Sequence, residues 1–267
     1  MEFTLTKHHG LENDFLVFDL AQGEPSLAWP DLARRWCARS TGIGADGLLL
    51  LGVHNTDLTM RLYNADGSLA EMSGNGIRCL VQAAHWSLGH GAHTTYAVKT
   101  DAGMRSVTVT SEWENNTVMA SVQMGEITDV AAPHNWDQLE CDPMRPVSHV
   151  SVGNPHSVVG VEEVSFIDLQ RLGELVPDVN LEIVEPGPGV NAITMRVHER
   201  GAGITRACGT GACAAADAAL RWGLVPASVE QVVVHMDGGT AFVAIDENRR
   251  ATLIGPAEFI ASVAVHV

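Results

Sequence analysis

The sequence predicts an α+β protein built from two similar halves. Residues 59–76 resemble residues 194–211, so the chain contains an internal repeat whose copies lie about half a chain apart. Each copy begins with Thr-Met-Arg and reaches a Ser/Cys-Gly-x-Gly turn at the same spacing. In each half, short strand-like segments surround one small-residue stretch that suits a helix. This pattern is typical of a curled sheet that holds a central helix.

In the first half, the elements follow from runs of apolar residues and the turns between them. Residues 31–39 have helical periodicity, with Asp31 as the expected N-terminal cap. A glycine-rich loop at 42–47 precedes a strand, and a second helix at 76–88 follows the Ser-Gly-x-Gly turn. The predicted strands span residues 16–20, 48–53, 59–63, 96–100, 106–110 and 118–124.

The second half repeats this order. A Gly-Asn-Pro-His turn at 153–156 leads into a strand, and a helix is expected at 166–175. A second helix at 211–222 follows the Cys-Gly-x-Gly turn, while residues 131–146, rich in proline and polar residues, look like a connection. The predicted strands span residues 157–161, 192–197 and 229–235. The turns at 100–103 and 236–239 also correspond.

The composition excludes several classes of protein. A formal charge of −16 with no basic stripe argues against a nucleic-acid or anionic-membrane partner. The N-terminus lacks a secretory signal pattern, and no run of apolar residues is long enough to predict a membrane span. The 5 cysteines are scattered without a CxxC pair, so neither a metal site nor a disulfide framework is expected. We therefore expect a reduced, cytoplasmic protein.

The two repeated turns are the strongest candidates for chemistry. Cys208 and Ser73 each precede a predicted helix, where unpaired backbone N–H groups and the positive end of the helix dipole favour negative charge. The flanking glycines allow the amides to approach a substrate carboxylate closely. No lysine lies in a pyridoxal-type setting, so α-proton abstraction would depend on this arrangement and not on a cofactor.

Together these motifs resemble the diaminopimelate epimerase family over nearly the whole chain. The resemblance is carried by residues 9–15 (HGLENDF), 64–68 (NADGS), 74–78 (GNGIR), 153–156 (GNPH), 199–203 (ERGAG) and 207–211 (ACGTG). It implies two pseudo-symmetric domains, residues 1–117 plus 256–267 and residues 118–255, with the site in the cleft between them. It also implies interconversion of LL-2,6-diaminopimelate and meso-diaminopimelate without a cofactor, in lysine and peptidoglycan-precursor synthesis.

The resemblance assigns roles to individual residues. The family uses two cysteines, one to remove the α-proton and one to return a proton on the other face; Cys208 matches the second. His156 and Glu199 resemble the groups that tune the thiols. The turn amides of Gly74, Asn75, Gly209 and Thr210 would hold the α-carboxylate. The other polar groups of the amino-acid diacid would be bound by residues matching Asn13, Asn64, Asn154, Asn191, Glu199 and Arg200.

The residues taken alone also allow structural roles. The three asparagines Asn13, Asn154 and Asn191 are residue types that stabilise turns, and His156 could satisfy a local backbone group. Glu199 and Arg200 could form a solvated ion pair. Cys37, Cys141 and Cys213 are expected to be small apolar fillers.

Ser73 stands where the family has its first catalytic cysteine, and a serine hydroxyl is far less acidic than a thiol. Three explanations stay open. The position was substituted deliberately, or the serine is natural with altered or impaired chemistry, or Cys79 replaces the missing thiol. The third is geometrically poor, since Cys79 would lie about 240° around the helix from Ser73 and about 9 Å along it. Cys79 is therefore expected to be buried structure.

Two alternative functions follow from this departure. One is a cofactor-independent isomerase or dehydratase of another amino acid, such as a proline derivative, whose substrate needs no second anion-binding end. The other is a non-catalytic amino-acid-binding homologue, which would bind ligand without isotope exchange. The acidic surface does not preclude a homodimer.

Overall fold

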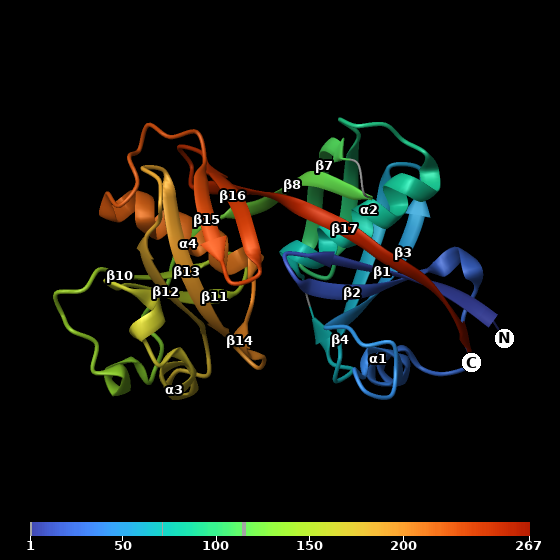
Figure 1. Cartoon of the computed structure of the whole chain (residues 1–267), viewed down its shortest axis with the longest axis horizontal. Helices are drawn as coiled ribbons and strands as arrows, with labels where there is room; N and C mark the ends of the chain where they lie inside the picture. The colour runs from blue at the N-terminus through green and yellow to red at the C-terminus, as the bar shows by residue number, and fades with distance from the viewer. Residues whose placement is uncertain (1, 71, 114–115) are drawn as a thin grey trace. The chain divides into compact units, whose positions relative to one another are not determined.

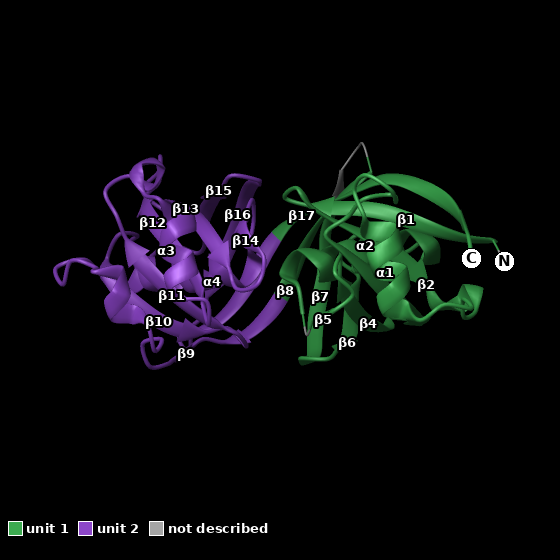
Figure 2. Ribbon diagram, turned by 90° about the horizontal axis from the view of Figure 1, so that it is seen from below, with its two compact units in different colours: residues 1–122, 255–267 green, residues 123–254 purple. Residues whose placement is uncertain are grey.

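The computed structural model describes residues 2–70, 72–113 and 116–267 and divides the chain into two compact units. Unit 1 comprises residues 1–122 and 255–267, and unit 2 comprises residues 123–254 (Figure 2). Each unit has a sheet that curls around one long helix, α2 in unit 1 and α4 in unit 2 (Figure 1). The predicted α+β class is confirmed.

Unit 1 is built from paired strands with two helices. Helix α1 spans Trp29–Cys37 and α2 spans Gly74–Leu88, with a short 3-10 turn at Leu20–Gln22. Strand β8 continues into unit 2, and the second part of β17 belongs to unit 1. The strands are β1 (Glu2–Gly10), β2 (Asn13–Asp19), β3 (Gly47–His54), β4 (Asp57–Asn64), β5 (Leu69–Ala70), β6 (Thr95–Thr100), β7 (Gly103–Trp113), β8 (Thr117–Glu126) and β17 (Arg250–His266).

Unit 2 is also built from paired strands with two helices. Helix α3 spans Leu169–Leu175 and α4 spans Gly209–Trp222, with 3-10 turns at Trp136–Leu139 and Val164–Phe166. Its strands are β9 (Thr128–Asp129), β10 (Val147–Ser151), β11 (Pro155–Gly160), β12 (Asn180–Pro186), β13 (Ala192–Glu199), β14 (Gly203–Thr205), β15 (Val232–Met236), β16 (Gly239–Ile245) and the first part of β17.

The repeat seen in the sequence is also a repeat of strand pairing. In unit 1, β1–β2 is antiparallel, β2–β3 parallel, β3–β4 antiparallel, β4–β6 parallel, and β6–β7 and β7–β8 antiparallel. In unit 2, β10–β11, β11–β12, β12–β13, β13–β15, β15–β16 and β16–β17 follow the same series of orientations. The two halves therefore share one topology, as the internal repeat predicted.

The strand registers make individual positions equivalent. Gly47 pairs with Phe15 and Asn64 in unit 1, and Asn180 pairs with His156 in unit 2. Leu181 pairs with His198, so Asn180 lies level with the end of β13, where Glu199 stands. Phe15 thus corresponds to His156, Gly47 to Asn180, and Asn64 to Glu199. Asn13 and Asn154 also correspond, since each stands two residues before Phe15 or His156.

The predicted central helices are confirmed, each beginning two residues before its expected start. Helix α2 packs against β1 to β4 and β7, and α4 against β10 to β13, β15 and β16. Both helices end at a glycine in the left-handed region, Gly89 (φ 64°) and Gly223 (φ 73°), whose amides bond back to the last turn. Burial of α4 on most sides is consistent with its alanine-rich composition, whereas α2 also buries the polar side chains of Arg78, Gln82 and His85.

The expected cap of the first helix is wrong. Helix α1 begins at Trp29, and its N-cap residue Ala28 provides no side-chain bond. Pro30 sets the first turn, since proline is well suited to the start of a helix. Asp31 lies inside that turn, where its carboxylate pairs with Arg34 at 2.6 Å.

The strands that the sequence did not predict include β1, β10, β12 and β16. Strand β12 is fully buried at its first five positions, yet these include Asn180 and Glu182, and such polar residues hide the apolar run of a buried strand. The final strand, β17, pairs antiparallel with β1 from His266 back to Glu258. Among the described residues, no helix is long and apolar enough to cross a membrane.

Arg78 is the largest side chain that unit 1 buries completely. Its guanidinium donates to the carbonyl oxygens of Pro256 (3.2 Å) and Gly74 (3.0 Å), and to Oδ1 of Asn75 (2.7 Å). Gly255 lies so close that an added Cβ would stand 3.1 Å from the guanidinium. Arg78 therefore ties the start of α2 to the segment of β17 that enters unit 1.

We expect Arg78→Ala to lower the free energy of unfolding by about 3 kcal/mol or more, because it removes several buried hydrogen bonds and leaves a cavity. Arg171→Ala is the matched control. Its exposed pair with Asp168 spans 3.9 Å, and its loss should cost less than about 0.5 kcal/mol. Urea denaturation of both variants measures the difference, and equal effects would contradict the role given to Arg78.

Candidate active site

Cys208 is the N-cap residue of α4. Its Sγ accepts a hydrogen bond from the backbone N–H of Gly211 at 3.3 Å, and the Oγ1 of Thr210 lies 3.5 Å from it. Only 4% of Cys208 is exposed. The thiol therefore lies at the first turn of the helix, among donors that would stabilise a thiolate.

Burial raises the pKa of the Cys208 thiol well above its ordinary value. The carboxylates of Glu199 and Glu182 raise this pKa further, while hydrogen bonds from Thr210 and the Gly211 amide lower it. A thiolate at this position consequently needs a group nearby that accepts the thiol proton.

Glu199 is the acceptor that the geometry provides. It is the last residue of β13, and its carboxylate accepts a hydrogen bond from Oγ1 of Thr205. Burial raises the pKa of Glu199, and hydrogen bonds from Thr205 and the Cys208 thiol oppose this rise. A raised carboxyl pKa brings the group closer to the range in which it exchanges protons with a thiol.

A chain of buried polar groups runs beneath the same helix turn. The Nδ1 of His156 lies 2.7 Å from Oε1 of Glu182, and both side chains are fully buried. The Nε2 of His156 lies 3.0 Å from Oδ1 of Asn154, whose Nδ2 lies 3.4 Å from Oγ1 of Thr210. The chain thus reaches the residue that contacts the Cys208 sulfur.

Ser73 occupies the corresponding place in unit 1, as the N-cap of α2. Its Oγ accepts from the backbone N–H of Gly76 at 3.0 Å, just as Cys208 accepts from Gly211. Ser73 is half-buried. Among the described residues, no titratable side chain forms a hydrogen bond with its hydroxyl, so the structure shows no base for it.

Three of the predicted substrate-binding residues of unit 1 lie near this turn or at strand ends. Asn13 donates to Oδ2 of Asp46 at 2.7 Å and accepts from Nδ2 of Asn75 at 3.2 Å. Asn64, the last residue of β4, donates to Oγ of Ser68 at 3.0 Å and is exposed. These contacts hold Asn13 and Asn75 in place beside the amides that follow Ser73.

In unit 2 the structure brings Asn154, His156, Glu199 and Thr210 together around Cys208. Arg200 follows Glu199, and its backbone N–H donates to Oδ1 of Asn180 at 2.8 Å while its side chain is exposed. A guanidinium binds carboxylates strongly, and the role of Arg200 as a substrate contact remains a prediction.

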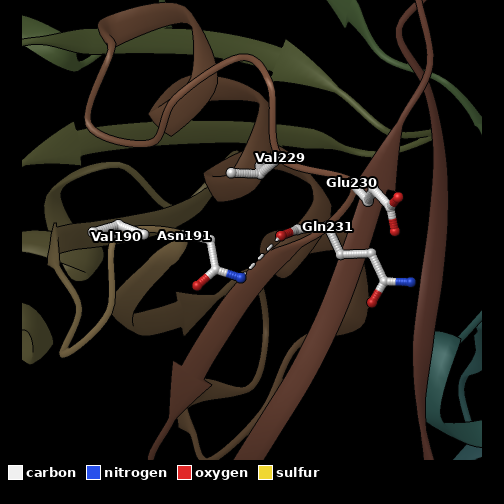
Figure 3. Close-up of a pocket in the computed structure, with 5 residues that line it drawn as sticks. All are labelled: Val190, Asn191, Val229, Glu230 and Gln231. Carbon is white, nitrogen blue, oxygen red and sulfur yellow. Dashed lines mark hydrogen bonds between the residues drawn. The ribbon is translucent and has the colours of Figure 1, made fainter.

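The structure does not bring Asn191 to this group. Asn191 precedes β13, whereas Glu199 ends it, so the two lie at opposite ends of a strand of 8 residues. Asn191 lines a shallow pocket with Val190, Val229, Glu230 and Gln231, and its amide reaches the Gln231 carbonyl oxygen at 3.5 Å (Figure 3). Its assigned role as a substrate contact remains a prediction without support from the geometry.

Two buried polar residues of β12 escaped the sequence analysis. Asn180 begins this strand at the level of Glu199, and Glu182 bonds to His156. The missed signal is the Val-Asn pair at 179–180, which resembles the Val-Asn pair at 190–191; Asn180 is the first residue of a buried strand, whereas Asn191 lies just outside one.

The remaining thiols are structural, as predicted. Cys79 is fully buried, and burial raises its pKa to about 12, so it does not replace the missing thiol of the first turn. Cys37 and Cys213 are buried, and Cys141 is half-buried. The described residues include no group of His, Cys, Asp and Glu side chains arranged to hold a metal ion.

Comparison with known proteins places this geometry in a family. The family model described as "Diaminopimelate epimerase" matches residues 5–130 and 148–260. A diaminopimelate epimerase from Synechococcus elongatus is 38% identical, with 96% of each chain covered. Another, from Cyanothece sp., is 36% identical over 97% of this chain and 98% of its own.

Solved structures show the same fold at low sequence identity. A predicted epimerase from Pseudomonas aeruginosa has a TM-score of 0.77 at 14% identity, with 99% of each chain covered. A hydroxyproline epimerase from Agrobacterium vitis has a TM-score of 0.67 at 14% identity, over 99% of this chain and 92% of its own. With the extent of the sequence match, the conclusion is plain: the chain belongs to the diaminopimelate epimerase family.

Proposed function

We propose that this protein interconverts LL-2,6-diaminopimelate and meso-diaminopimelate by removing the α-proton and returning one to the opposite face, without a cofactor. Family membership supports the reaction, since the similar proteins carry that name. The observation that carries the proposal is the buried Cys208 thiol at a helix N-terminus. Its sulfur accepts a hydrogen bond from the Gly211 amide, and the thiol donates to the neighbouring carboxyl group of Glu199.

The proton steps can be assigned to named atoms. Glu199 takes the proton of the Cys208 thiol, and the resulting thiolate removes the α-proton, while the electron pair of the C–H bond stays on the substrate. The first amides of α4, at Gly209 and Thr210, have no partner within the helix and would bind the α-carboxylate. Charge that develops beside that carboxylate is stabilised by these fixed donors.

Ser73 would serve the other face of the α-carbon. A hydroxyl that gives up its proton leaves an alkoxide, which is costly without an adjacent base. We therefore propose that the chain exchanges the α-proton on the Cys208 side faster than it inverts the centre. Asn13, Asn64, Asn154 and Arg200 would bind the polar groups of the diacid.

The assignment of Cys208 predicts that Cys208→Ala abolishes α-proton exchange. Cys213→Ala is the matched control, because Cys213 lies in the same helix, is fully buried and has no assigned chemical role. Deuterium incorporation into diaminopimelate, followed by mass spectrometry, measures both. If exchange survives in Cys208→Ala, Cys208 has no role in the reaction. If the wild-type protein binds diaminopimelate without exchange, it is a non-catalytic homologue.

The assignment of Ser73 predicts that Ser73→Cys accelerates inversion by about 100-fold or more, since a thiol then supplies acid–base catalysis on the second face. The rate of conversion of LL- to meso-diaminopimelate, read by chiral chromatography, measures the gain. Ser87→Cys, in the last turns of α2, is the control for the addition of a thiol. An unchanged or lower rate in Ser73→Cys would contradict the account.

The role of Glu199 predicts a pH dependence. Glu199 must be ionised to accept the thiol proton, so activity is lost as the pH falls through its raised pKa. Thr205→Val removes a hydrogen bond that lowers this pKa, and the acid limb of kcat/KM should move to higher pH. Thr240→Val, whose hydroxyl contacts His235 instead, should leave the limb in place. A limb that stays or moves to lower pH in Thr205→Val would overturn the role.

A further inference from the structure

The two halves carry side chains of different kinds beneath the first turn of the central helix. In unit 1, the positions are apolar: Phe15 is 3% exposed and Leu49 is fully buried. In unit 2, the equivalent positions carry His156 and Glu182, which are also fully buried. The strand registers establish the equivalence. Phe15 pairs with Gly47, two residues before Leu49, and His156 pairs with Asn180, two residues before Glu182.

Glu182 lies directly under the turn that holds Cys208. A Cβ added at Gly211 would stand 2.7 Å from Oε1 of Glu182, so only glycine leaves room for this carboxylate. The equivalent Gly76 meets the Phe15 ring instead, at 3.4 Å. The hydrogen-bonded pair of His156 and Glu182 is thus placed under the thiol, while an aromatic ring is placed under the hydroxyl.

A series of hydrogen bonds leads from this pair to the Cys208 sulfur, and each group in it donates to a definite partner. Oε1 of Glu182 and Oδ1 of Asn154 are both acceptors, so this arrangement is fully hydrogen-bonded when both nitrogens of His156 donate. The amide nitrogen of Asn154 then donates to Oγ1 of Thr210. A hydroxyl that accepts this bond keeps its single proton free, and Sγ of Cys208 lies within reach of it.

We propose that Glu182 is a positioning residue for Cys208: its carboxylate holds His156 as an imidazolium, which orients the Asn154 amide so that the Thr210 hydroxyl donates to the Cys208 sulfur. This inference deepens the proposed function and rests on Cys208 as its acid–base group. If His156 were neutral, its Nε2 would accept instead. The Asn154 amide would then turn over, and Thr210 would donate to Asn154 rather than to the sulfur.

The energetics favour a functional reason for this pair. A carboxylate that is removed from water is costly unless it is paired and fully hydrogen-bonded. The second oxygen of Glu182, Oε2, has no hydrogen-bond partner among the described residues. Unit 1 packs the same positions with apolar side chains alone, so the fold itself does not require the ionic pair.

The test is the ionisation of Cys208 in Glu182→Gln, a substitution that keeps the shape of the side chain. The titratable groups around the sulfur are His156 on β11, Glu182 on β12 and Glu199 on β13. Ultraviolet absorbance of the thiolate, taken as the difference from Cys208→Ala, reports the titration without substrate. We expect thiolate formation to move to higher pH, because the Thr210 donor is lost while the neutralised His156 offsets the removal of the Glu182 charge.

A purely electrostatic role predicts the opposite sign. The negative charge of Glu182 opposes ionisation of Cys208, so its simple removal would bring the thiolate to lower pH. A shift to lower pH, or no shift, overturns the proposal. Glu185→Gln is the control on the same strand; its carboxylate accepts from the backbone of Val164, and its titration curve should match the wild type.

A double-mutant cycle tests the route through Thr210. Thr210→Val removes the hydroxyl and keeps the backbone amide, and each single variant should lower kcat about 10-fold while KM changes little. Glu182→Gln combined with Thr210→Val should be no worse than either alone, whereas independent effects would multiply and overturn the route. Because the thiolate titration needs no turnover, the inference and the proposed function can fail separately.

Discussion

Each half of the molecule depends on how the first turn of its central helix is closed. The first amides of a helix have no partner within it, and those of α2 and α4 lie at the start of buried helices, where such groups must be satisfied. Ser73 and Cys208 close these turns by accepting from the third helical amide, at Gly76 and Gly211. The side chain that is placed for chemistry is therefore also the cap on which the helix depends.

The two caps are not equivalent in cost. A serine cap is worth about 1 kcal/mol, whereas a thiol is a weak acceptor and caps less well. Cys208 thus costs stability at a place where serine would serve the fold better, as the other half shows. Groups that favour folding less than their alternatives tend to lie at functional sites. The burial of His156 and Glu182 under the same turn follows this pattern, since Phe15 and Leu49 fill the equivalent space without ionic groups.

Much of this architecture could be predicted from the sequence because the sequence contains an internal repeat. The matched turns indicated the starts of α2 and α4, and the asymmetry between Ser73 and Cys208 was visible from the residues alone. Strand β12 could not be predicted, because buried polar residues interrupt its apolar run. That omission hid Asn180 and Glu182. Without β12, the predicted strand at 192–197 was the one that drew attention to a preceding asparagine, Asn191. The structure places Asn191 at the end of β13 opposite to Glu199.

The contacts around a site such as this one depend on strand register, which sequence spacing alone does not give. Residues 154, 156, 182, 199 and 210 meet around Cys208 because the strands β11, β12 and β13 and the helix α4 each have one end at a common level. In unit 1, the same register places Asn13 and Asn75 beside the Ser73 turn. One topology thus carries two sets of side chains, and the differences between the sets, not the fold, determine the chemistry of each half.

The most direct measurement is to incubate the unmodified protein in deuterated water with LL-diaminopimelate and, separately, with meso-diaminopimelate. Deuterium at the α-carbon and the stereoisomer formed are followed together. The account predicts deuterium incorporation through Cys208 that is faster than inversion, because Ser73 is the weaker acid–base group. No deuterium incorporation from either isomer would contradict it.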